Sequence, residues 1–237
     1  YDNISAYSVA GSPFIEITKK VQRDSIDIVV LASKSDPLVK HHFGSTTKHL
    51  MRKCPCPVLA LGEHSTKPIK RILAAVDVFS PSEEGLALNN QILRWAKKMA
   101  AMTDASIHIV HAWQTPSDAY LLGWNIKSQV ERVELIMKEQ QARQQFLNAL
   151  IAENFIDGDN ITTELIEGKP TEVISGYVEQ NDIDLVVVGT VCRTGIAGFF
   201  IGNTAESLLN EVSCSVLALK PEGFTSPDKI SAKASPA

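Results

Sequence analysis

The sequence predicts an α/β protein made of two tandem copies of one fold, the first of which lacks its front half. Residues 26–33 (IDIVVLAS) recur 157 positions later as residues 183–190 (IDLVVVGT). Residues 51–61 (MRKCPCPVLAL) recur 158 positions later as residues 209–219 (LNEVSCSVLAL). A period this long indicates two domains rather than a solenoid of short repeats. Strand patterns alternate with helical patterns, which predicts right-handed crossovers and a doubly wound parallel sheet.

The complete copy is expected over residues 68–222 and contains five strand patterns. The first, residues 71–77, is an apolar run that ends in the carboxylate of Asp77, as expected of a buried parallel strand. The last is followed by Pro221, which cannot donate to a sheet. The remaining strands are predicted at residues 105–112, 161–166, 183–189 and 215–219.

Helical patterns fill the gaps between these strands. Ser80-Pro81-Ser82-Glu83 offers a cap, a proline at the first helical position and a glutamate three residues after the cap. Apolar residues then recur at helical spacing as far as Met99. Further helices are predicted at residues 127–154, 171–180 and 203–212. The inner stripe of the longest is expected to consist of Val130, Val133, Phe146, Leu150 and Ile151.

Residues 1–63 are expected to form the C-terminal half of the first copy. The repeat assigns to them the third, fourth and fifth strands of that copy, with two helices between: strands at 4–9, 26–32 and 57–61, and helices at 14–23 and 46–53. Residues 223–237 follow the second copy, and their end is rich in Ser, Ala and Pro without an apolar period. We expect this tail to be disordered.

Composition excludes several classes of function. Hydrophobic residues make up 44% of the chain and charged residues 21%, which is typical of a soluble globular protein. A net charge of −4 gives no reason to expect nucleic acid or an anionic membrane as a partner. The chain has no apolar run near the length of a membrane span. Four cysteines fit a reducing compartment better than a disulfide framework, so we expect a cytoplasmic protein.

The candidate site lies at the carboxyl ends of the inner strands. In open α/β sheets ligands bind where the strand order reverses, which for the order 3-2-1-4-5 lies between strands one and four. Asp77 ends the first and Gly189 ends the fourth. A glycine-rich loop then leads to a helix start at Asn203, where free amides favour phosphate. Asp77 is placed to accept from a ribose hydroxyl or an adenine amino group, or alternatively to start an Asx turn.

This loop carries a more specific pattern. It reads Gly189-Thr-Val-Cys192, nine residues, then Gly202-Asn203 and Thr204. The frame resembles the universal stress protein family, whose nucleotide-binding members carry G-x2-G-x9-G-[ST] there. The first and third glycines match, whereas Cys192 replaces the second glycine and Asn203 the Ser/Thr. The resemblance covers nearly the whole chain except the tail.

The resemblance implies a Rossmann-like fold of the adenine nucleotide alpha hydrolase type, with a five-stranded parallel sheet in each domain. It implies a non-catalytic stress-response protein that binds ATP or another adenine nucleotide, with no metal beyond the Mg²⁺ of the nucleotide. Asp77 matches the aspartate of the first strand, and Ala112 matches the apolar residue of the adenine pocket. The positions that hold ribose and phosphates are matched by Val188, Gly189, Gly202, Asn203 and Thr204.

Cys192 keeps a second hypothesis open. A side chain where the backbone needs φ > 0 costs on the order of 1 kcal/mol, or it blocks a ligand's approach. The alternative is therefore an interaction protein that lacks nucleotide binding, or that holds an apolar or sugar-nucleotide ligand in the altered loop. A third hypothesis, slow ATP hydrolysis, finds no residue that stands out as a base or metal ligand. The first copy has lost both leading glycines of the frame, so we expect no nucleotide there.

By analogy with the family, residues 57–61 and 215–219 should pair edge to edge and join the two sheets within one chain, covering exposed edges. The resemblance is also compatible with a homodimer. Cys54-Pro55-Cys56 is a strained spacing for a disulfide and matches no strong zinc pattern. Cys56 and Cys214 occupy equivalent repeat positions, which favours a packing role.

Overall fold

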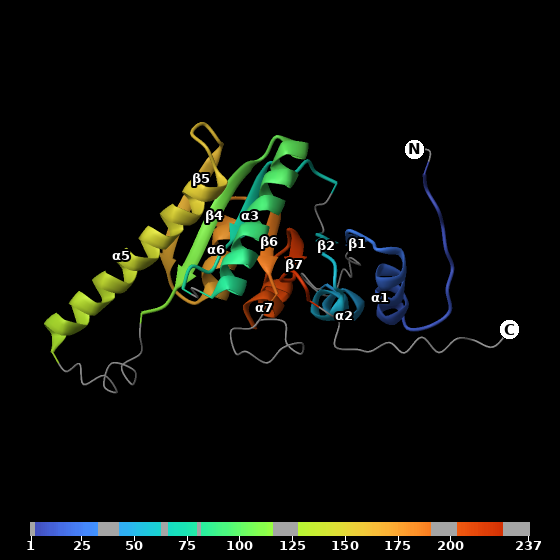
Figure 1. The fold of residues 1–237 in the computed structure, drawn as a ribbon, viewed down its shortest axis with the longest axis horizontal. Coiled ribbons are helices and arrows are strands. Elements are labelled where there is room, and N and C mark those ends of the chain that lie inside the picture. The colour runs from blue at the N-terminus through green and yellow to red at the C-terminus, as the bar shows by residue number, and fades with distance from the viewer. Residues whose placement is uncertain are drawn as a thin grey trace.

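The structure is a computed structural model and describes residues 3–32, 43–62, 66–79, 82–115, 128–190 and 203–224 of the 237-residue chain. In these ranges one sheet runs through the molecule with helices on both faces (Figure 1). The strands are β1 (Val29–Ala32), β2 (Val58–Leu61), β3 (Arg71–Ala75), β4 (Ser106–Trp113), β5 (Ile161–Glu167), β6 (Leu185–Gly189) and β7 (Ser215–Leu219). The helices are α1 (Pro13–Asp24), α2 (Ser45–Lys53), α3 (Glu83–Thr103), α5 (Gln129–Asn154), α6 (Pro170–Gln180) and α7 (Asn203–Glu211).

The predicted α/β class is confirmed, but the described sheet has seven strands rather than five, in the order β1-β2-β7-β6-β3-β4-β5. The five strands of the second copy run β5-β4-β3-β6-β7, all parallel, which is the order 3-2-1-4-5. The sheet continues because β2 pairs antiparallel with β7, with Leu59 opposite Leu217. β1 then pairs parallel with β2. Both copies therefore share one hydrogen-bonded sheet.

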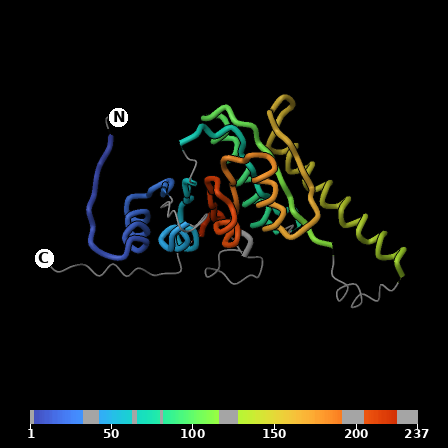
Figure 2. The backbone as a smooth tube through the Cα atoms, turned by 180° about the vertical axis from the view of Figure 1, so that it is seen from behind, coloured from blue at the N-terminus to red at the C-terminus, as the bar shows by residue number. Residues whose placement is uncertain are grey.

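Two apolar cores cover the faces of this sheet. On one face α1, α2, α6 and α7 contribute buried side chains such as Val21, Leu50, Ile174 and Leu208. Figure 2, seen from behind, shows α6 and α7 in front of the strands. On the other face α3 and α5 bury Ile92, Leu93, Ala96, Leu147 and Leu150. Residues from β3, β6 and β7 alternate between the two cores, as expected of strands buried on both sides.

One face of the first copy is exposed in the described part of the chain. Val30 of β1 is 53% exposed, whereas its repeat equivalent, Val187 of β6, is fully buried in the core beneath α3. In the described residues 3–32 and 43–62 the helices are α1 and α2, and both contribute to the core on the other face of the sheet. The predicted strand at residues 4–9 is wrong, because this segment lies outside the sheet with Ile4, Tyr7 and Val9 exposed. Its repeat equivalent, β5, pairs with β4, and the described part of the first copy has no counterpart of β4.

The predicted inner stripe of the long helix, α5, is wrong at three of its five residues. Val130, Val133 and Phe146 are exposed on α5, whereas Leu150 is buried and Ile151 is half-buried. Figure 1 shows the N-terminal half of α5 extending past the end of the sheet, and Val130 and Val133 are exposed there. The helix begins at Gln129 with a capping box between Ser128 and Glu131. α3 likewise starts later than predicted, at Glu83, with Ser82 as its cap.

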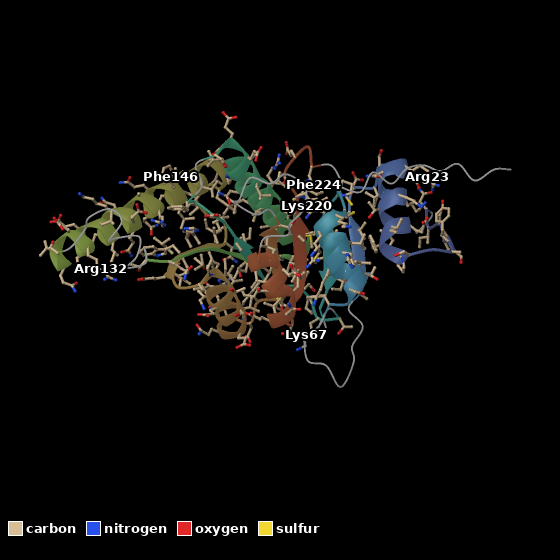
Figure 3. All side chains as sticks on the ribbon, turned by 90° about the horizontal axis from the view of Figure 1, so that it is seen from below. Arg23, Lys67, Arg132, Phe146, Lys220 and Phe224 are labelled. Atoms are coloured by element: carbon tan, nitrogen blue, oxygen red, sulfur yellow. The ribbon has the colours of Figure 1, made fainter. Side chains whose placement is uncertain are left out.

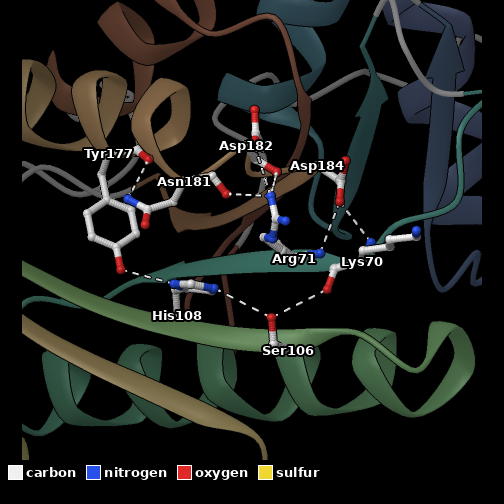
Figure 4. Close-up of polar contacts among 8 residues, drawn as sticks. All are labelled: Lys70, Arg71, Ser106, His108, Tyr177, Asn181, Asp182 and Asp184. Atoms are coloured by element: carbon white, nitrogen blue, oxygen red, sulfur yellow. Dashed lines mark hydrogen bonds and ion pairs between the residues drawn. The ribbon is translucent and has the colours of Figure 1, made fainter.

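A polar cluster fixes the amino ends of the central strands (Figure 4). The Asp184 carboxylate accepts from the backbone N–H groups of Lys70 and Arg71 at 2.8 and 3.0 Å. The Arg71 guanidinium donates to the Asn181 carbonyl, which joins the start of β3 to the turn before β6. On β4 the ring of His108 lies 3.0 Å, Nδ1 to Oη, from Tyr177 of α6. These contacts lie at the edge opposite the candidate site and serve to set the strand register.

Candidate nucleotide site at the carboxyl edge

The carboxyl ends of β3 and β6 lie side by side in the middle of the second copy, with Ala75 opposite Val188. α3 runs from this edge along one face of the sheet, and α7 runs from it along the other face. This divergence is the switch point at which ligands of doubly wound sheets bind. The backbone of α7 starts at Asn203, so the positive end of its dipole lies at this same edge.

Asp77 lies just beyond β3 and is held by Asn89 of α3. The Asp77 backbone N–H donates to Asn89 Oδ1 at 3.0 Å, and Asn89 Nδ2 donates to the Asp77 carbonyl at 2.8 Å. Asp77 Oδ1 accepts from the backbone N–H of Phe79 at 3.1 Å. The carboxylate therefore forms the Asx turn that was the structural alternative for this residue. Asn89 is buried, and sequence reasoning missed it, although an amide among the apolar positions of α3 was a visible signal.

Ala112 is buried on β4, one residue before the strand ends. Its neighbour His111 is also buried, and His111 Nδ1 donates to the Val76 carbonyl at 3.0 Å. The backbone N–H of Val76 donates to the Val110 carbonyl in turn. These bonds extend the β3–β4 pairing past the last ladder residue of β3. The histidine was not recognised from sequence as part of this edge.

Val188 and Gly189 end β6 as predicted. Val188 is buried between Ala75 of β3 and Ala218 of β7. A Cβ atom at Gly189 would lie 2.6 Å from Leu88 Cδ2, because α3 packs directly onto the end of the strand. Helix packing is thus a structural reason for this glycine, in addition to the one that the family frame implies.

The loop that should hold the phosphates is outside the described residues. Gly202 and Cys192 both fall in the undescribed range 191–202. Asn203 and Thr204 are described only as the first backbone residues of α7. The described residues thus bring together Asp77, Ala112, Val188, Gly189 and the start of α7.

A buried arginine closes the β4 side of this edge. Arg143 of α5 lies between two aromatic rings, with its guanidinium carbon 4.6 Å from the centroid of Phe79 and 5.1 Å from that of Trp113. Its Nη1 donates to the carbonyl of Glu139 at 2.9 Å and to its carboxylate. Such cation–π contacts stabilise a desolvated guanidinium. This arrangement could not be predicted from the sequence, because Arg143 interrupts the apolar pattern of α5.

A buried lysine links the site to the first copy. Thr190, directly after β6, bonds to the Leu219 carbonyl through its backbone N–H and its hydroxyl. Lys220 Nζ donates to Thr190 Oγ1 at 2.5 Å and to the carbonyl of Met51 in α2. Figure 3 labels Lys220 where the C-terminal strand of the second copy meets α2 of the first. Burial lowers the pKa of Lys220 to about 7.

Two negative findings hold for the described ranges. They contain no group of three or more His, Cys, Asp or Glu side chains that could hold a metal ion. Among them, no helix is both long enough and apolar enough to cross a membrane.

Comparison with known proteins identifies relatives of this chain and of its fold. A model of the Universal stress protein family matches residues 3–62 and 68–220. Universal stress protein E from Salmonella typhi is 31% identical over 219 residues, covering 91% of this chain and 67% of that protein. The Escherichia coli K12 protein of the same name is 31% identical over 220 residues, with the same coverage.

Solved structures share the fold. The functionally unknown protein PA1789 from Pseudomonas aeruginosa PAO1 has a TM-score of 0.73 at 27% identity, over 91% of this chain and 70% of that chain. A universal stress protein from Archaeoglobus fulgidus has a TM-score of 0.57 at 18% identity, over 89% and 67%, which shows likeness of fold alone. With two family matches that together span most of its length, the chain belongs to the universal stress protein family.

Proposed function

We propose that this stress protein binds an adenine nucleotide, ATP with its Mg²⁺, at the carboxyl edge between β3 and β6, and that it acts without catalysing a reaction. The observation that carries the proposal is the pairing of Ala75 with Val188, which puts Asp77 and Gly189 at one switch point beside the start of α7. Family membership supports the choice of an adenine nucleotide. The free thiols of Cys54, Cys56 and Cys214 support a reducing, cytoplasmic location.

In this proposal, different residues contact the base, the ribose and the phosphates of the nucleotide. Ala112 and Val188, both buried, line the apolar part of the pocket where the base lies. Asp77 accepts a hydrogen bond from the ribose or the base, while the Asn89 clamp holds the Asp77 backbone in place. Gly202, Asn203 and Thr204 contact the phosphates at the helix start, where the dipole favours negative charge.

The test is calorimetric titration with MgATP of the parent and of Asp77→Asn. Asparagine keeps an oxygen for the Phe79 N–H but removes the charge, so the turn survives while ligand binding weakens by roughly tenfold, the worth of one charge-assisted hydrogen bond. Asp182→Asn is the matched control, because that side chain is 87% exposed at the opposite edge. Equal affinity for ATP in the parent and Asp77→Asn would show that the carboxylate does not touch the nucleotide.

Two observations favour the second candidate, an interaction protein without nucleotide or with an apolar or sugar-nucleotide ligand. The Asp77 carboxylate is already engaged by the Phe79 N–H, and Cys192 stands where the family frame has a glycine. Titration of Cys192→Gly beside the parent separates the two functions. Binding of ATP by the variant alone would mean that the thiol position has disabled the pocket. Native mass spectrometry of freshly purified protein would then reveal any other ligand that copurifies.

A further inference from the structure

Two thiols of the first copy are in contact at the junction with the second. Cys54 ends α2 with an extended backbone (φ −68°, ψ 130°), and Cys56 follows two residues later. Pro55 between them has its φ fixed by its ring. In extended chain the side chains at i and i+2 point the same way, and the two Sγ atoms lie 3.5 Å apart. Both residues are buried, Cys54 completely.

The internal repeat shows that packing does not require this pair. In the second copy the equivalent positions hold Val212 and Cys214, both buried in the same core as Cys54 and Cys56. A valine therefore satisfies the position of Cys54 in the same turn of the same fold. Burial raises the pKa of Cys214 to about 12, which leaves it unreactive as a nucleophile. A paired thiol is thus a particular property of the first copy.

The surroundings make the two thiols unequal. The hydrogen bond between them lowers the pKa of Cys54, and the same bond together with burial raises that of Cys56. The positive charge of Lys220 acts on Cys54 in the same direction as the hydrogen bond. That amine is held in place by the Met51 carbonyl in the last turn of α2 and by Thr190. Cys54 lies three residues after Met51, at the helix end that holds this amine, and is therefore the nucleophile of the pair, with Cys56 adjacent to it as the resolving thiol.

We propose that Cys54 and Cys56 are a reversible oxidation site, at which a small hydroperoxide converts two contacting thiols into a disulfide at the junction of the two copies. The Cys54 thiolate attacks the terminal peroxide oxygen, so an S–O bond forms, the O–O bond breaks, and water or an alcohol leaves after taking up a proton. The Cys56 sulfur then attacks the Cys54 sulfur, so the S–S bond forms and the S–O bond breaks. The hydroxide that leaves takes the Cys56 proton as water. Two thiols are oxidised and one peroxide is reduced.

The strain of this spacing makes the product reversible. A disulfide that spans a single residue closes a small ring, and strained disulfides are the more easily reduced ones. The disulfide would also form at the end of a helix that contacts the second copy. Cys54 caps α2, whose Met51 carbonyl receives Lys220 from the second copy, so closing the S–S bond changes the end of the helix on which the two copies meet.

The experiment treats the whole chain in a Cys192→Ser background with one equivalent of hydrogen peroxide, so that the only remaining thiols are Cys54, Cys56 and Cys214. Thiols are then alkylated under denaturing conditions and mapped by mass spectrometry. We expect a disulfide within the peptide that holds Cys54 and Cys56, its complete reversal by dithiothreitol, and an alkylated Cys214. If both thiols of the pair stay alkylatable, or if one is oxidised to sulfinic acid while the other stays reduced, the proposal is overturned.

Three variants sharpen the test. Cys54→Val copies the side chain at Val212, so it should fold like the parent and form no disulfide. Cys214→Ala at the equivalent position of the second copy is the matched control and should oxidise like the parent. Lys220→Met should slow oxidation, because removing the cation raises the pKa of Cys54 and so lowers its thiolate fraction. Disulfide formation that persists in Cys54→Val would show that another thiol is responsible.

Discussion

Gly62 offers the sharpest test of how the two copies are joined. It directly follows β2, and its backbone N–H donates to Ser215 Oγ at 3.1 Å. A Cβ atom at this position would lie 2.4 Å from the Ser213 carbonyl oxygen and 2.6 Å from the Cys214 carbonyl carbon. Both are backbone atoms at the entry to β7, so no side chain can rotate away to make room. Gly62→Ala must therefore push β2 and β7 apart.

The magnitude follows from two costs. Overpacking a tight contact costs about 1–3 kcal/mol, and losing the bond to Ser215 leaves a buried N–H unsatisfied at about 1 kcal/mol or more. We expect Gly62→Ala to lower the free energy of unfolding by about 3 kcal/mol. The loss should be concentrated at the β2–β7 pairing, since the opposed residues Leu59 and Leu217 lie only three residues from Gly62 and Cys214 respectively.

The assay is urea denaturation followed by circular dichroism, with amide hydrogen exchange of residues 58–61. Gly176→Ala is the matched control, because this glycine lies inside α6 and nothing lies within 4 Å of an added Cβ. Alanine should stabilise that helix by up to about 1 kcal/mol. If Gly62→Ala unfolds at the same urea concentration as the parent, with unchanged exchange at 58–61, then the junction is not the tight contact described here.

Three further predictions concern polar groups. The pKa of Lys220 is about 7 in the folded chain, so between pH 7 and 8.5 the unfolded chain binds more protons at this lysine. The free energy of unfolding should therefore rise by roughly 1.5 kcal/mol over this pH range. Urea titrations of Lys220→Met should show no such rise. Asn89→Ala leaves the Asp77 N–H and carbonyl unpaired, so it should cost about 2 kcal/mol by urea denaturation and weaken MgATP binding as well. Burial and the Arg71 charge lower the pKa of His108, so the unfolded chain takes up this proton before the folded chain does. The free energy of unfolding should therefore fall as pH drops below about 6.5. Between pH 7.5 and 5.5 the urea midpoint of His108→Gln should change less than that of the parent.

Much of the fold was predictable because it depends on local and repeated signals. The strand runs at residues 71–77 and 183–189 are continuous and apolar, and the repeat supplied the same order twice. The predictions that were wrong concern segments whose structure depends on a neighbouring strand or sheet. Residues 4–9 carry the strand pattern of their repeat equivalent, but no strand of the described residues pairs with them. The apolar residues of α5 are spread around the helix, and only the sheet's extent decides that Leu147 is buried while Val133 is not.

The candidate site divides in the same way. Asp77 and Gly189 could be placed at one edge from strand order alone, because parallel strands end together. Asn89, His111 and Arg143 could not, because each acts through a contact that is distant in the sequence. The Asn89 amide bonds to a backbone twelve residues away and His111 to one 35 residues away, while Arg143 contacts the rings of Phe79 and Trp113. No periodicity encodes such contacts.

The antiparallel pairing of β2 with β7 has an evolutionary consequence. Two identical subunits that meet through such an edge must keep both surfaces at once, since each mutation appears on both sides. Here the meeting partners are covalently linked and free to differ: one side fits with Gly62 against backbone, while the other reaches across with Lys220. A single chain that carries both edges is released from this constraint, so a change on one side of the junction need not appear on the other.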